Sequence, residues 1–73
     1  MPCVDMKATG DNIRAICMRS GFKVSDVADA AGISKTAVYK WFNGTAMPTV
    51  DNIVILASIF NVKMDDIVAV RFV

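Results

Sequence analysis

Two residue types that build active sites are scarce or missing in this sequence. Histidine is absent, and cysteine occurs only as Cys3 and Cys17. Without histidine the chain lacks the commonest zinc ligand and the commonest general base. Two cysteines form neither a disulfide framework nor a metal cluster, and Cys17 falls in an apolar helical pattern typical of a buried thiol. We therefore expect no catalytic residue, no metal site and no cofactor, and a protein that is not an enzyme.

Long apolar runs and a strong net charge are also missing. No stretch approaches the roughly 18 residues of a membrane span, and the N-terminal MPCVDMKATG lacks the apolar core of a signal peptide. These absences predict a cytoplasmic protein without membrane contact. The net charge is only +1, but five cations and only two aspartates lie within residues 12–44. The position of the cations is therefore more informative about nucleic-acid binding than their number.

Apolar residues, in contrast, are abundant for a chain of this size. The 73 residues correspond to one domain, and 55% of them are hydrophobic, whereas roughly 45–50% is usual. A domain this small cannot cover so many apolar side chains by itself. We therefore expect a surface for self-association.

Helical periodicity predicts an all-α fold with five short helices. Residues 1–10 are expected to form a flexible segment, and Asp11 is the expected N-cap of the first helix, which ends at Ser20 and Gly21. The later helices are expected, in chain order, over residues 24–31, 35–42, 50–60 and 64–69.

The resulting domain spans residues 11–69. Ser34 and Thr49 are suitable N-caps for the third and fourth helices. We expect residues 70–73 to form a short C-terminal tail. Three conformations stay open for it: an extension of the fifth helix, an extended segment, or a segment that pairs across a dimer. No alternation is strong enough to predict a sheet.

The second and third helices have the pattern of a helix-turn-helix. Ala28 is small enough for two helices to cross near 90–120°, and Gly32 accepts the positive φ that the turn between them requires. Val38 and Trp41 then anchor the third helix in the core. The outer arc of that helix carries only hydrogen-bonding side chains, and its members, with Lys35 at the edge, are Thr36, Tyr39, Lys40 and Asn43.

With these residues the chain resembles the phage-repressor/Cro-type (Xre-like) helix-turn-helix regulators. The matching segments are SGFKVSDVADAAGIS, TAVYKWFNG and MPTVDNIVILASIFNVKMDDI, and the resemblance covers about residues 12–68. It implies a compact five-helix, repressor-like domain that binds double-stranded DNA. The partner that it implies is a palindromic operator bound by a homodimer.

The resemblance also assigns roles to single residues. The residues expected to read bases in the major groove are Lys35, Thr36, Tyr39 and Lys40. The residues expected to contact phosphates, in part through backbone N–H groups near the last of them, are Lys23, Asn43 and Thr45.

The chain departs from the family pattern at several positions. Cys17 and Phe42 stand where the family often has a partly buried Arg–Glu ion pair, a replacement that leaves no charge to desolvate. Val24 stands where a phosphate-contacting Gln is usual, and residues 44–48 lack basic side chains. These departures predict roughly four phosphate contacts per subunit at most, and a shallow salt dependence of DNA binding.

Apolar residues near the C-terminal end predict the dimer interface. Ile55 and Ile59 are i, i+4 neighbours where the family normally shows polar surface. The full set expected in the interface is Ile55, Ile59, Val62, Met64, Val68 and Phe72. Pairing through this end would place two recognition helices about 34 Å apart, one turn of DNA.

The leading hypothesis is a sequence-specific transcriptional regulator, a repressor in its simplest form. Two alternatives stay open, because the net charge is nearly neutral and the loop at residues 44–48 has no cation. One is an antitoxin that binds a toxin partner and its own promoter. The other is a protein-interaction module that keeps the fold, binds DNA weakly and recognises an effector protein.

Overall fold

The structure of the chain, a computed structural model, describes residues 1–72. Its elements are β1 (Pro2–Val4), α1 (Met6–Arg19), α2 (Val24–Ala31), α3 (Lys35–Asn43), α4 (Val50–Phe60), α5 (Met64–Ile67) and β2 (Val70–Phe72). The five predicted helices are confirmed, and α2 and α4 have the predicted bounds. The prediction for α5 was two residues too long, because Val68 takes an extended conformation after Ile67.

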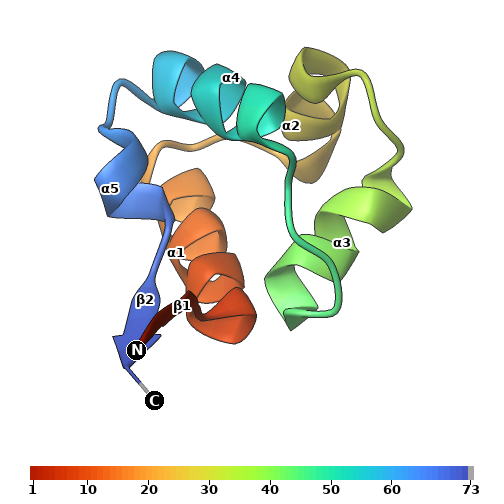
Figure 1. Ribbon diagram of the computed structural model, residues 1–73. Coiled ribbons are helices and arrows are strands. Elements are labelled where there is room, and N and C mark those ends of the chain that lie inside the picture. The colour runs from red at the N-terminus through yellow and green to blue at the C-terminus, as the bar shows by residue number, and fades with distance from the viewer. Residues whose placement is uncertain (73) are drawn as a thin grey trace.

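The helices surround one apolar core. α1 lies between α3 on one side and α5 on the other, while α4 crosses the end at which α1 finishes and contacts both α2 and α5 (Figure 1). The core draws at least one buried side chain from every helix, and its members are Ile13, Ile16, Cys17, Val27, Ala28, Val38, Trp41, Phe42, Ile53, Leu56, Phe60 and Ile67. Within residues 1–72, no helix is both long enough and apolar enough to cross a membrane.

The start of α1 differs from the prediction. We expected residues 1–10 to be flexible and Asp11 to cap the helix, but α1 begins at Met6 and its N-cap is Asp5, whose carboxylate accepts from the Ala8 N–H at 2.9 Å. Asp11 is instead an exposed helical residue, paired with Lys7 at 2.6 Å. Both aspartates are good caps, and contacts with the rest of the chain decide between them.

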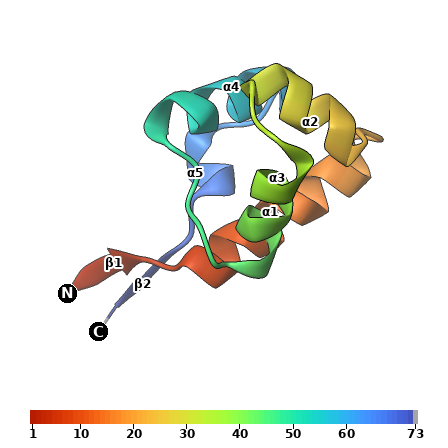
Figure 2. The ribbon, with the colours of Figure 1, turned by 90° about the vertical axis from the view of Figure 1, so that its right-hand side faces the viewer.

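Those contacts come from the C-terminal end of the chain. β1 and β2 pair as an antiparallel ribbon, with Cys3 opposite Arg71, and the ribbon projects away from the helices (Figure 2). The Asp5 N–H donates to the Ala69 carbonyl at 2.9 Å, and the Ala69 N–H donates to the hydroxyl of the fully buried Thr9 at 3.0 Å.

The predicted C-terminal tail is therefore extended, and its described residues pair with the N-terminal strand of their own chain. The tail residue Val73 lies outside the described residues. The predicted all-α class omitted this small sheet, since its pairing joins the two ends of the chain and leaves no local signal in the sequence.

Gly10 permits a close approach between α1 and α3. A Cβ atom on Gly10 would overlap the Trp41 carbonyl oxygen and lie 3.1 Å from that of Phe42. α1 therefore lies directly against the backbone of α3, and only a residue without a side chain fits at this position. The position of α3 depends on this contact.

Gly10→Ala tests the contact. In an ordinary helix this change stabilises by about 0.5–1 kcal/mol. Here we expect a free energy of unfolding lower by about 1–3 kcal/mol, because the helices must separate to admit the methyl group. Urea denaturation followed by Trp41 fluorescence measures the change, and Ala15→Gly, on the exposed side of α1, is the control, with a loss of about 1 kcal/mol from helix propensity alone. An equal or higher midpoint for Gly10→Ala would contradict the packing.

Candidate nucleic-acid interface

The turn between α2 and α3 fixes the angle at which these helices cross. Gly32 has φ 69° and ψ 35°, in the left-handed region that the turn was predicted to need. Ala28 is buried, and its carbonyl accepts from the Ile33 N–H at 3.0 Å. Ser34 caps α3, with its hydroxyl accepting from the Ala37 N–H at 3.2 Å. The predicted turn and cap are confirmed.

α3 has one buried and one exposed face. Val38, Trp41 and Phe42 are buried in the core. The predicted reading residues are all exposed on the opposite side, and these are Lys35, Thr36, Tyr39 and Lys40. A row of hydrogen-bonding side chains is therefore exposed on a short helix whose opposite face is packed in the core.

The three residues predicted to contact phosphates are all exposed, but they differ in whether their hydrogen-bond donors are already used within the chain. Asn43 is exposed at the end of α3, and Lys23 is exposed just before α2. Thr45 is also exposed, but its N–H and its hydroxyl both donate to the Lys40 carbonyl, at 3.0 and 3.2 Å. Thr45 therefore closes the end of α3, and neither of its donors is free for a phosphate while these hydrogen bonds persist.

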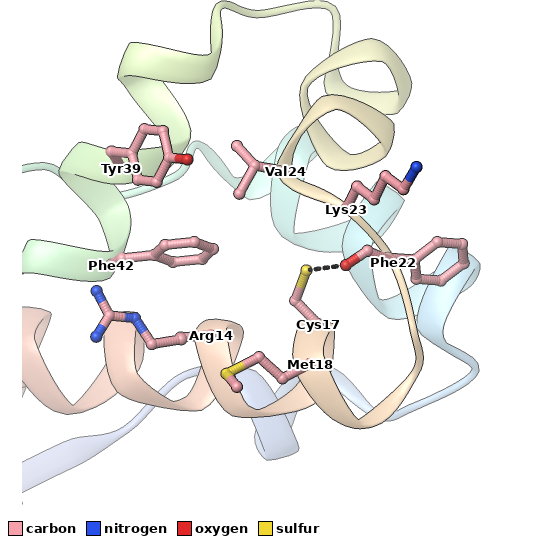
Figure 3. Close-up of a pocket in the computed structure, with 8 residues that line it drawn as sticks. All are labelled: Arg14, Cys17, Met18, Phe22, Lys23, Val24, Tyr39 and Phe42. Atoms are coloured by element: carbon pink, nitrogen blue, oxygen red, sulfur yellow. Dashed lines mark hydrogen bonds between the residues drawn. The ribbon is translucent and has the colours of Figure 1, made fainter.

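A hollow of about 490 Å³ lies between α1, the start of α2 and the outer side of α3 (Figure 3). We call it the three-helix pocket; its lining residues are Arg14, Cys17, Met18, Phe22, Lys23, Val24, Tyr39 and Phe42. It brings together Lys23 and Tyr39, two of the predicted DNA-contacting residues. The pocket also contains Arg14, for which the sequence analysis predicts no DNA contact.

Arg14 is held against α3 by aromatic contacts. Its guanidinium carbon lies 5.3 Å from the centre of the Phe42 ring, a cation–π contact. The Tyr39 ring meets Phe42 edge-on, with 6.0 Å between ring centres and 85° between their planes. Phe42 thus lies between Arg14 and Tyr39 and connects α1 to the outer face of α3 (Figure 3).

Cys17 closes the inner end of the pocket and behaves as a core residue. Its side chain is 3% exposed, and its thiol donates to the Phe22 carbonyl at 3.1 Å. Burial raises the pKa of the Cys17 thiol above its ordinary value, and the nearby negative charge of Asp26 raises it further. The thiol is therefore neutral at physiological pH and poorly nucleophilic.

The residues predicted for the dimer interface do not form one exposed patch. Ile59, Val62 and Val68 are partly buried and pack against the core, and Ile55 is also partly buried. The other two members of the predicted set are clearly exposed, Met64 at 41% and Phe72 at 79%.

The exposed apolar side chains of α4 lie elsewhere on that helix. They belong to Val50 and Val54, which are 69% and 49% exposed. The family resemblance and the i, i+4 spacing favour Ile55 and Ile59, but neither of them shows how far a neighbouring helix covers each flank of α4.

These features define a helix-turn-helix protein of the type that binds DNA through the exposed face of its second helix. A family model described as helix-turn-helix matches residues 13–67, well over half of the chain. The chain therefore belongs to this family, the Cro/C1-type (Xre-like) DNA-binding regulators of transcription. Within residues 1–72, no three or more His, Cys, Asp or Glu side chains are grouped to hold a metal ion.

Solved structures of two regulators share the fold. The restriction-modification controller protein C.AhdI from Aeromonas hydrophila matches with a TM-score of 0.77 and 19% sequence identity, covering 86% of this chain and 96% of its own. The clp gene regulator ClgR from C. glutamicum matches with a TM-score of 0.75 and 14% identity, covering 85% of this chain and 80% of its own. No curated protein sequence matches the chain.

The burial of Cys17 has a measurable consequence. In a Cys3→Ser variant, which leaves Cys17 as the sole thiol, we expect modification by a disulfide reagent at pH 8 to be at least about tenfold slower than in denaturant, because thiolate and access are both reduced. The rate should keep rising with pH above the ordinary thiol pKa, because the folded pKa is raised. Equal rates in the folded and unfolded protein would show that Cys17 is accessible.

Proposed function

We propose that this chain is a transcriptional repressor that binds a palindromic operator as a homodimer and reads it with α3. The observation that carries the proposal is the exposed polar face of α3, backed by a buried face and capped at both ends. Lys35 and Lys40 suit the O6 and N7 acceptors of guanine, and Thr36 suits a thymine methyl group or a base acceptor. Membership of the helix-turn-helix family supports this assignment.

The ribbon supports a dimer. Its register sets Pro2 opposite Phe72 and Val4 opposite Val70, so these four side chains share one face, while Cys3 and Arg71 occupy the other. All four are exposed. A lone two-stranded ribbon is marginally stable in water, so a second copy that covers this apolar face would stabilise both ribbons. Phe72, a member of the predicted interface set, is the largest side chain of this apolar face and lies at the outer end of the ribbon.

A second candidate function has its own supporting observation. Val50 and Val54 expose apolar surface on α4, away from the ribbon pairing, and residues 44–48 carry no cation. These features suit a protein-interaction module or an antitoxin, with a toxin or effector protein bound at α4. Selection of DNA sequences distinguishes the interaction module from the repressor, and a bound toxin distinguishes the antitoxin, which also binds its own promoter.

The DNA test is the selection of bound duplexes from a random pool at low salt. A repressor should enrich a palindromic consensus, and Lys40→Ala should then cost about 1–3 kcal/mol and relax one position in each half-site. The control is Lys63→Ala, which removes an exposed cation before α5 and should preserve the consensus. If the pool shows no enriched sequence, the interaction-module proposal replaces the repressor.

The dimer test is sedimentation velocity across the micromolar range. Phe72→Ser should raise the dimer Kd at least about tenfold, because burial of a large apolar side chain contributes about 1.5–3 kcal/mol and is lost from both protomers. Met18→Ser, which changes a residue 75% exposed at the other end of α1, should leave the Kd unchanged. A wild-type monomer at high micromolar concentration would refute the dimer.

A further inference from the structure

The three-helix pocket joins a positive charge from α1 to one from the start of α2. Arg14 and Lys23 lie on opposite sides of the pocket, and none of its lining residues is acidic (Figure 3). The nearby carboxylate of Asp26, which accepts from the Lys23 backbone N–H at 2.9 Å, lies on the Lys23 side, so the Arg14 side is the more positive. The remaining lining is apolar or aromatic, including Val24, whose side chain offers no donor. Such a surface attracts an anion that also presents apolar groups, as the phosphates and sugars of a DNA backbone do.

The pocket lies on the side of the molecule where α3 exposes its hydrogen-bonding side chains. Tyr39 lines it and also belongs to the exposed face of α3. Lys23 lines its other side. A duplex docked on α3 would therefore bring one strand of its backbone past this pocket.

The guanidinium of Arg14 is both positioned and available. Within residues 1–72 the one salt bridge joins Lys7 to Asp11, so no described carboxylate pairs with Arg14. Its described contact is with the face of Phe42, and a cation–π contact occupies none of the five N–H donors of a guanidinium. Arg14 thus keeps its full charge and its donors while its side chain is restrained beside α3.

We propose that Arg14 binds a phosphate of the DNA backbone at the three-helix pocket, on the side opposite Lys23, which the family resemblance already assigns to a phosphate, and that Phe42 positions Arg14 for this contact. Arg14 then provides a phosphate contact that Val24 cannot make. Because Phe42 also touches Tyr39, the same ring orients a phosphate-binding residue and a residue of the reading face. This inference rests on the proposed DNA binding and adds a determinant of affinity to it.

The test compares Arg14→Gln with Arg19→Gln, the same change of charge at an exposed residue of α1 outside the pocket. Binding to the selected operator is titrated between 50 and 200 mM salt. Loss of one phosphate contact per protomer should reduce the slope of log K against log salt by about 0.9 for each protomer. For a dimer, the ratio of wild-type to Arg14→Gln affinity should therefore fall about tenfold over this range, whereas Arg19→Gln should keep the wild-type slope.

The role of Phe42 is tested by a double-mutant cycle. Phe42→Leu keeps an apolar core side chain but removes the ring, so Arg14→Gln should have a smaller effect on affinity and slope in the Phe42→Leu background than in the wild type. Circular dichroism establishes that each variant is folded. The base consensus should be unchanged by Arg14→Gln, because a phosphate contact carries no direct sequence information.

The outcomes separate this inference from the proposed function. If the wild type binds a specific duplex and Arg14→Gln has the slope of Arg19→Gln, the phosphate contact is wrong and the repressor stands. If Arg14→Gln has the same effect in both backgrounds, the positioning role of Phe42 is wrong. If the wild type selects no duplex, the proposed function fails and this inference fails with it.

Discussion

The fold depends on one close contact, the packing of α1 against the backbone of α3 at Gly10. A methyl group there would collide with the Trp41 carbonyl, and on the same seam a Cβ atom on Gly44 would lie 2.7 Å from the Cα of Lys7. Gly10 within α1 and Gly44, the C-cap of α3, therefore set the distance between α1 and the end of α3. Because α3 is only nine residues long, too short to be stable by itself, this contact and the buried face of α3 fix where its exposed face points.

The same contact determines which residue of α1 lies beside the outer face of α3. Gly10 and Arg14 are four residues apart, so both face the same side of the helix. With Gly10 against Trp41, Arg14 comes next to Phe42, and its guanidinium lies over that ring. The packing of the core and the position of Arg14 at the surface therefore both follow from how α1 is aligned along α3.

Sequence patterns predicted the parts of this fold that depend on neighbouring residues. Gly32 and Ser34 identified the turn and the start of α3, because a left-handed turn and a capping hydroxyl are local requirements. The predicted start of α1 was wrong, because Thr9 and Gly10 are poor helix formers. The contacts that stabilise this part of the helix come from Ala69 and Trp41, which are far away in the sequence. No role was predicted for Arg14 for a related reason, because its position beside DNA depends on which face of α1 packs against Phe42.

A nearly neutral net charge is compatible with the binding of DNA by such a molecule. Nonspecific affinity depends on the number of phosphate contacts, whereas discrimination depends on base contacts made by rigidly placed side chains. In the proposed complex Lys35 and Lys40 contact bases, whereas Arg14 and Lys23 contact phosphates, so the low net charge lowers nonspecific affinity more than specific affinity. Sparse charge in this arrangement favours a high ratio of specific to nonspecific binding, which is the quantity that selects an operator among many competing sites.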